Sequence, residues 1–122
     1  MRTLFFLLLV GGLSCRNEKA ADQEPSQTEP AFIYANNLAS DGCEEFVRLD
    51  HGNPSTDVMY KPTVTSLPIL QNALRTLPTG TGSLEHPVII RFRETGNQVS
   101  LQCGWGSRPT IGEIEILSID KR

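Results

Sequence analysis

The side chains that could do chemistry in this chain are two histidines, three cysteines and a few carboxylates. His51 stands in an Asp-His-Gly-Asn-Pro segment, and His86 precedes a proline at the start of an apolar run. These two histidines could bind a metal together with Asp50 or Asp57, but the sequence has no His-x-x-x-His spacing that would indicate such a site. We therefore expect both histidines to lie in surface loops, without a bound metal.

The sequence lacks the usual patterns of nucleophilic and acid–base catalysis. No serine stands in a Gly-x-Ser-x-Gly motif, and the glycines of 80–82 lack the lysine and helix of a phosphate-binding loop. Glu44 and Glu45 are adjacent, so on a strand they point to opposite faces. Glu113 and Glu115 share a face, which solvation alone explains. We expect a protein that is not an enzyme and uses no cofactor.

The chain begins with a basic residue, continues with a short apolar run and a few small residues, and then reaches Cys15. This order is the layout of a secretory signal. The cysteine at this position makes residues 1–14 resemble a bacterial lipoprotein signal peptide, which is cut just before a cysteine that is then lipidated. The apolar run is too short for a membrane span, which needs roughly 20 residues. Secretion without a lipid is the competing interpretation, because Gly12 and Leu13 do not match the residues usual before such a cysteine.

Cys43 and Cys103 are then left as a pair in an oxidising compartment, where a disulfide is the default. The bridge would close a loop of about sixty residues, which the chain-entropy model values at roughly 4 kcal/mol. A metal or redox pair is the alternative, but there is no Cys-x-x-Cys and two ligands do not make a zinc site. A disulfide also removes the thiolate that Cys–His chemistry needs.

Residues 15–30 are expected to be the lipidated cysteine and a disordered linker. From residue 16 to 30 no aliphatic or aromatic residue is larger than alanine, and Glu, Gln, Pro and Ser are frequent. Such a segment cannot bury enough surface to offset its ordering entropy. It spans about 20–25 Å in a root-mean-square sense. The linker would hold a single small domain, residues 31–122, away from a membrane surface.

The domain is expected to be mainly β. Alternating runs at 86–93 and 99–103 flank a Glu-Thr-Gly-Asn turn at 94–97, which predicts a hairpin with one buried and one exposed face. The buried face is expected to hold Val88, Ile90, Phe92, Val99 and Leu101, and the exposed face Arg91, Arg93 and Ser100. Further strands are expected at 32–39, 43–49, 58–64 and 111–119. Pro62 places one of them at a sheet edge, and a slip of the apolar phase at Leu117 predicts a bulge or a strand buried on both faces.

One helix is expected after Ser66, which can cap it, with Pro68 in its first turn. Its apolar side is expected to hold Ile69, Leu70, Ala73, Leu74 and Leu77. Strands followed by one helix and further strands, in so small a domain, favour closure into a barrel, which removes exposed edges. We expect a small OB-like barrel of about five or six strands, with the helix closing one end, rather than a sandwich.

Trp105 is the single tryptophan and stands between two glycines just after Cys103. It could anchor a glycan or protein partner, or it could cover the disulfide and the open end of the barrel, which is the interpretation we favour. Arg91, Arg93 and Arg108 are expected either to gather for an acidic ligand or to pair with acidic residues across neighbouring strands.

The net charge of −3 is spread without a basic block, and aromatic residues are few, so nothing indicates nucleic-acid binding. We expect a non-catalytic binding or structural module, held on a membrane of the bacterial cell envelope by its lipid, with an envelope protein or a glycan as partner. The alternative is an inhibitor of an exported hydrolase, in which the loop 79–85 acts on the enzyme.

Several short motifs lie between residues 41 and 122. They lie at 41–49 (DGCEEFVRL), 60–62 (YKP), 103–106 (CGWG) and 114–116 (IEI), with a basic ending at 120–122. In these motifs the chain resembles a family of small uncharacterised lipoproteins of Bacteroidota-type bacteria over residues 41–122. The resemblance implies an envelope location, a disulfide and a compact β domain, and it implies no activity. The chain departs from the family pattern in its long insertion at 78–85.

Overall fold

The computed structural model of the protein describes residues 25–80 and 84–122. The predicted signal peptide, Cys15 and the linker up to residue 24 lie outside the described residues. The elements are the strands β1 (Gln27–Tyr34), β2 (Phe46–Leu49), β3 (Met59–Pro62), β4 (Glu85–Ser100) and β5 (Thr110–Lys121), the helix α2 (Leu67–Thr76), and the short 3-10 turns η1 (Leu38–Ser40) and η2 (Gly104–Gly106).

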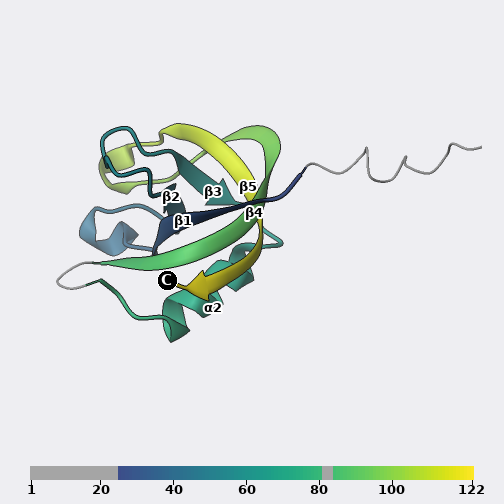
Figure 1. Ribbon diagram of the computed structural model, residues 1–122. Coiled ribbons are helices and arrows are strands. Elements are labelled where there is room, and N and C mark those ends of the chain that lie inside the picture. The colour runs from purple at the N-terminus through teal and green to yellow at the C-terminus, as the bar shows by residue number, and fades with distance from the viewer. Residues whose placement is uncertain (1–24, 81–83) are drawn as a thin grey trace, which may run out of the picture.

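The strands form a closed barrel in the order β1-β2-β3-β5-β4 (Figure 1). Pairing is antiparallel throughout except between β3 and β5, which run parallel. This confirms a mainly β, OB-like barrel with one short helix. The expectation that Pro62 lies at a sheet edge is wrong, because β3 is paired on both sides. Pro62 is its last residue, and the N–H of Thr63 donates to the Ile114 carbonyl instead.

The domain begins earlier than residue 31. β1 starts at Gln27, and residues 27–30 pair with β4 from Phe92 to Ile89, so the predicted linker boundary at residue 30 needs correction. Composition was misleading because a strand at the rim of a barrel satisfies its backbone hydrogen bonds while its polar side chains stay partly exposed.

The predicted hairpin within 86–103 is wrong, because β4 is one continuous strand that pairs with β5 on both sides of the expected turn. The register shifts between Glu94 and Gln98, and Gly96 lies there with a φ of 87°. The Glu-Thr-Gly-Asn segment is therefore a bulge, of the kind that bends a long strand so that a barrel can close. The true hairpin joins β4 to β5 through η2.

The alternation on β4 was nevertheless predicted with the correct phase. Val88, Ile90 and Phe92 are buried in the core, and Leu101 just after the strand is buried as well, whereas Val99 beyond the bulge is only partly buried. Arg91 and Ser100 are exposed and Arg93 is half-buried. The core comprises Ala31, Ile33, Val47, Leu49, Tyr60, Leu70, Ala73, Val88, Ile90, Phe92, Ile114 and Ile116.

A bulge at Leu117 is confirmed by the strand register. Arg91 lies opposite Ser118 and Phe92 lies opposite Ile116, so Leu117 is the extra residue on β5. The bulge reverses the apolar phase of β5 and lets Ile119 pack against the core.

The helix begins after Ser66, as predicted, with a proline in its first turn. The Ser66 hydroxyl does not cap the helix; it accepts the Ile116 backbone N–H over 3.1 Å and so ties the start of α2 to β5. Leu70 and Ala73 are buried, and Leu74 and Leu77 are partly buried. The expectation for Ile69 is wrong, since its side chain is 36% exposed on the flank of the helix.

Candidate binding surface

Two loops meet at one end of the barrel, and we call them together the loop end: the β1–β2 loop (35–45), which contains η1, and the β4–β5 loop (101–109), which contains η2. The Cys43–Cys103 disulfide joins them, as predicted. Backbone bonds reinforce the joint, from Glu44 N–H to Gln102 O at 2.9 Å and from Gly104 N–H to Gly42 O at 2.7 Å. The loop end lies opposite the point where the chain enters β1 (Figure 1).

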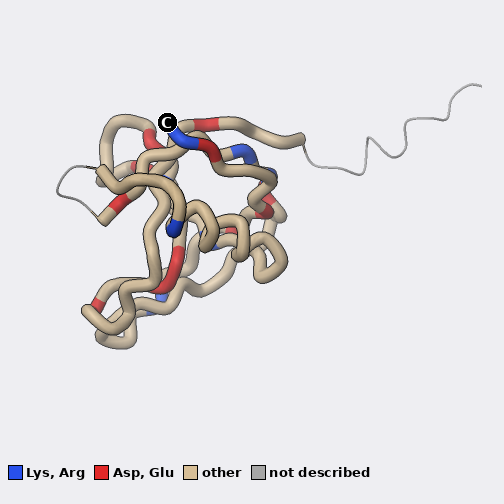
Figure 2. The backbone as a smooth tube through the Cα atoms, turned by 90° about the horizontal axis from the view of Figure 1, so that it is seen from below, with Lys and Arg blue, Asp and Glu red and all other residues tan. Residues whose placement is uncertain are grey.

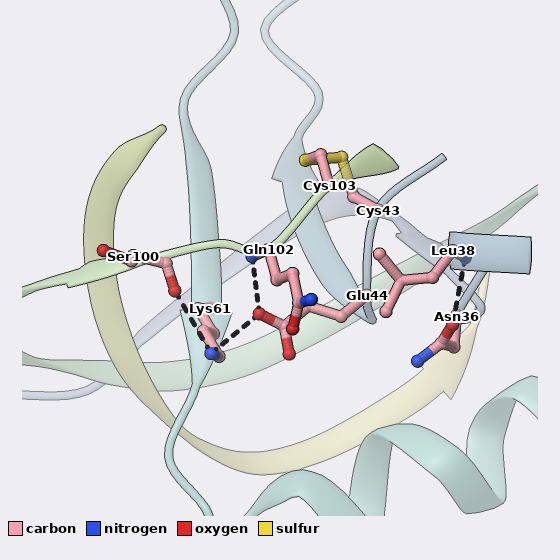
Figure 3. The surroundings of a disulfide bond; sticks show 8 residues. All are labelled: Asn36, Leu38, Cys43, Glu44, Lys61, Ser100, Gln102 and Cys103. Atoms are coloured by element: carbon pink, nitrogen blue, oxygen red, sulfur yellow. Dashed lines mark hydrogen bonds and ion pairs between the residues drawn. A yellow bond between two sulfur atoms is a disulfide. The ribbon is translucent and has the colours of Figure 1, made fainter. Parts of the chain in front are cut away.

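The Glu44 carboxylate fastens this joint from below (Figure 3). Its Oε2 accepts the Gln102 backbone N–H at 2.7 Å and the Lys61 ammonium at 2.9 Å, and Lys61 also donates to the Ser100 carbonyl. Burial by itself raises the pKa of Glu44, but the Gln102 N–H and the Lys61 charge outweigh it and hold that pKa below its usual value. Glu44 therefore connects the two loops as a carboxylate.

Only glycine can occupy position 104. A Cβ on Gly104 would lie 2.5 Å from the Cα of Asp41, closer than side chains approach a backbone. Because Gly104 has no side chain, the β4–β5 loop can lie directly on the β1–β2 loop, next to the Cys43–Cys103 disulfide.

Trp105 projects into solvent from the clamped loop. Its side chain is 88% exposed, and its backbone is left-handed, with φ 61° and ψ 18°. The favoured expectation that it covers the disulfide and the barrel end is therefore wrong. Leu101 is the buried side chain of this loop. At Gly104 the β4–β5 loop lies directly against Asp41, and the backbone is left-handed at the next residue, Trp105.

The three arginines lie in different surroundings, and among the described residues only Arg93 of the three forms an ion pair. Arg93 Nε lies 3.2 Å from Glu115 Oε1 on the neighbouring strand, which is the pairing alternative predicted for it. Arg91 is exposed in β4, opposite Ser118. Arg108 lies in the β4–β5 loop, where its charge helps to lower the pKa of Glu44. An acidic ligand bound by all three at once is therefore not supported.

The two histidines differ. His51 is in a loop, as expected, and its Nε2 lies 2.9 Å from Glu29, whose hydrogen bond raises the pKa of this histidine. His86 is only 8% exposed, so the expectation of a surface loop is wrong for it. Asp50 is paired with Arg122 and Asp57 with Arg48, and among residues 25–80 and 84–122 no group of acidic, histidine and cysteine side chains is arranged to hold a metal.

The adjacent carboxylates Glu44 and Glu45 have separate partners, although both lie in the loop before β2 and not on the strand that was expected to begin at residue 43. Glu45 accepts a hydrogen bond from Gln71 on α2, away from the Glu44–Lys61 pair. Glu113 Oε1 accepts hydrogen bonds from Thr95 and Asn97 in the bulge.

An arginine–aromatic cluster on the outer face of β1 and β2 escaped the sequence analysis. The Arg48 guanidinium lies 4.5 Å from the ring centre of Phe32 and binds Asp57, Glu85 and the Tyr34 hydroxyl. Burial, followed by the hydrogen bond to Glu85, raises the pKa of Tyr34, so its hydroxyl stays a donor. Arg48 therefore connects β2 to the loop that contains Asp57 and to the start of β4 at Glu85. In the sequence, the only indication of this cluster was that Phe32 and Tyr34 are two positions apart and so share one face of a strand.

Comparison with protein-family models, curated proteins and solved structures found no significant match. The class of the protein therefore rests on its own fold, a small OB-like barrel with a disulfide-clamped loop end. None of the described helices has the length and apolarity to cross a membrane. Acidic and basic residues are interspersed along the described backbone (Figure 2).

Proposed function

We propose that the protein is a non-catalytic binding module of the bacterial cell envelope, anchored by a lipid on Cys15 and contacting its partner through the loop end around Trp105. The exposure of Trp105 carries the proposal. A left-handed backbone at a bulky residue costs energy, and an indole in solvent recovers none of it by packing. Exposed tryptophans on rigid loops are typical anchors of interfaces.

The clamped loops support this assignment. A disulfide, the Glu44 hydrogen bonds and the close contact at Gly104 hold Trp105 on a pre-formed surface, which lowers the entropy lost on binding. OB-type barrels commonly use these same two loops for oligosaccharides and oligonucleotides, although that is an analogy of fold alone. Interspersed charges make a nucleic-acid partner the less suitable of the two.

The position of the chain start supports the anchoring. β1 begins at the end of the barrel opposite the loop end (Figure 1). A domain tethered through its N-terminus would therefore present Trp105 away from the membrane. The disulfide suits an oxidising compartment, and the resemblance to Bacteroidota-type lipoproteins suits an envelope location.

Replacing Cys15 with alanine is expected to move the protein from the membrane fraction to the soluble fraction, or to leave it unprocessed, because the lipid is then lost. Cell fractionation and intact-mass measurement check both outcomes. A variant with its signal removed that stays fully bound to the membrane would contradict lipid anchoring at this cysteine.

Replacing Trp105 with asparagine is expected to weaken partner binding on the order of tenfold or more, as loss of an interface anchor does. Asparagine tolerates a left-handed backbone, so the loop should keep its shape. The measurement is capture from an envelope extract, followed by titration of the captured partner against both forms. Val64→Ala is the matched control, because Val64 is also almost fully exposed and lies outside the loop end.

Unchanged binding by the Trp105 variant would overturn the assignment of the loop end. If the sole partner is an exported hydrolase whose activity falls on binding, the inhibitor alternative is favoured instead. Residues 81–83 of the 79–85 loop proposed for that role lie outside the described residues.

A further inference from the structure

A pocket of about 370 Å³ opens between the β1–β2 loop and the chain that leads into β4. Its lining residues are Tyr34, Ala35, Asn36, Asn37, Gly42, Cys43, Phe46, Thr79, Leu84 and His86. None of them belongs to the β4–β5 loop that carries Trp105. The volume falls in the range of small-molecule sites, roughly 300–1,000 Å³.

The walls of the pocket are largely apolar and carry no acidic side chain, lysine or arginine. The rings of Tyr34 and Phe46 stack with centroids 4.4 Å apart and planes 7° apart. No lysine, arginine, aspartate or glutamate is among the lining residues. The polar lining groups of Tyr34 and Asn36 are already engaged, the hydroxyl with Glu85 and Arg48 and the amide oxygen with the Leu38 N–H. A charged ligand would find no counter-ion here.

His86 supplies a polar group that the fold itself does not use. The residue is more than nine-tenths buried, and its Nδ1 lies 2.9 Å from the Leu77 carbonyl, which can only accept. Nδ1 therefore carries a proton, and in the tautomer with that single proton Nε2 is an acceptor. Within the described residues, no hydrogen-bond partner of Nε2 is found.

The Nε2 atom of His86 is also not sealed inside the protein. Among the described side chains, the one fully enclosed nitrogen or oxygen without a hydrogen bond is Arg93 Nε. His86 Nε2 is therefore not among the fully enclosed atoms, and His86 is one of the residues that line the pocket. A buried acceptor kept open to a cavity costs free energy unless water or a ligand satisfies it.

We propose that this pocket binds a small uncharged molecule with a planar apolar body and one hydrogen-bond donor, in the manner of an indole or a phenol. The planar body lies against the Tyr34–Phe46 wall, and its donor binds His86 Nε2. The proposal goes beyond the proposed function, because it requires neither the lipid nor Trp105.

Titration with indole, followed by NMR on the full chain carrying Cys15→Ala, tests the proposal without lipid or detergent to absorb the probe. We expect saturable shifts at the lining residues and at the His86 Nε2 resonance, and intermolecular NOEs from indole to Phe46 and Leu84. 1-Methylindole, which has the same planar shape without the donor, should bind at least about tenfold more weakly.

Ala35→Phe is expected to abolish indole binding, because Ala35 is an exposed lining residue from which a ring can fill the pocket. Ala39→Phe is the matched control, since Ala39 is exposed in η1 and does not line the pocket. If Ala35→Phe fails to fold, the NOEs in the chain without this substitution decide the site.

Three results would overturn the proposal: no saturable shift up to the solubility of indole, NOEs only to Trp105, or equal affinity for indole and 1-methylindole. Trp105→Asn should leave indole binding unchanged while weakening capture of the partner. Failure of the pocket is therefore distinguishable from failure of the loop end.

Discussion

Replacing Phe92 with alanine is expected to lower the free energy of unfolding by about 3–5 kcal/mol, enough to unfold much of the population. Phe92 is the largest fully buried side chain among the described residues. The centroid of its ring lies 5.7 Å from the ring centroid of Tyr60 on β3. It also sits beside the register shift opposite Leu117, where β4 and β5 bend together. A cavity at that point removes contacts from several strands at once, and closely paired strands cannot easily collapse into it.

Urea unfolding at fixed temperature, with the disulfide intact, measures this effect. Val99→Ala is the matched control, because Val99 lies on the same strand beyond the bulge and is only partly buried. Its loss should be clearly smaller, since less apolar area is removed from the interior. A loss below about 1 kcal/mol for Phe92→Ala would mean that the register of β4 in the core is misassigned.

Removing the Cys43–Cys103 disulfide is expected to cost roughly 2–5 kcal/mol of stability. The bridge joins residues 60 positions apart, so it restrains a large part of the unfolded chain. The double variant Cys43→Ser/Cys103→Ser avoids leaving one free thiol. Native structure should persist near the joint under mild conditions, because the Glu44 and Gly104 hydrogen bonds do not involve sulfur.

The unfolding midpoint in urea is the appropriate measurement for the double variant. Trp105 emission is a poor reporter, because the indole is already in solvent in the folded state. Reduction of the unmodified protein should reproduce the loss, which serves as the control. Thiol titration of the unfolded, lipidated protein should find no free thiol. Two reactive thiols without reductant would contradict the bridge and reopen the metal or redox interpretation.

Features governed by neighbours along the chain could be predicted. Alternation predicted that Val88, Ile90 and Phe92 face the core. On β5, a slip of the apolar phase at Leu117 predicted either a bulge or a strand buried on both faces, and the register shows the bulge. Serine followed by a proline two positions later predicted the start of α2. These patterns reflect the geometry of single strands and helix ends, which is set within a few residues.

Features that depend on partners distant in sequence could not be predicted. The same Gly-Asn signal suits a turn or a bulge, and only pairing with β5 decided that Gly96 lies in a bulge. Gln27 is part of β1 because its backbone pairs with β4 at Phe92, and this pairing is not visible in the local sequence. The Arg48 cluster draws on residues from Phe32 to Glu85, which no local pattern connects.

The sequence by itself predicted the barrel class, the core face of β4, the start of the helix and the pairing of Cys43 with Cys103. The period of the apolar residues, the residue types at a helix start and the few available cysteines can all be read from the chain. The tertiary structure decided that Trp105 is exposed and that His86 is buried beside a pocket. Exposure at a barrel end depends on how closely two loops approach, here at Gly104 and Asp41. That approach is set by closure of the whole barrel, and the types of the neighbouring residues do not encode it.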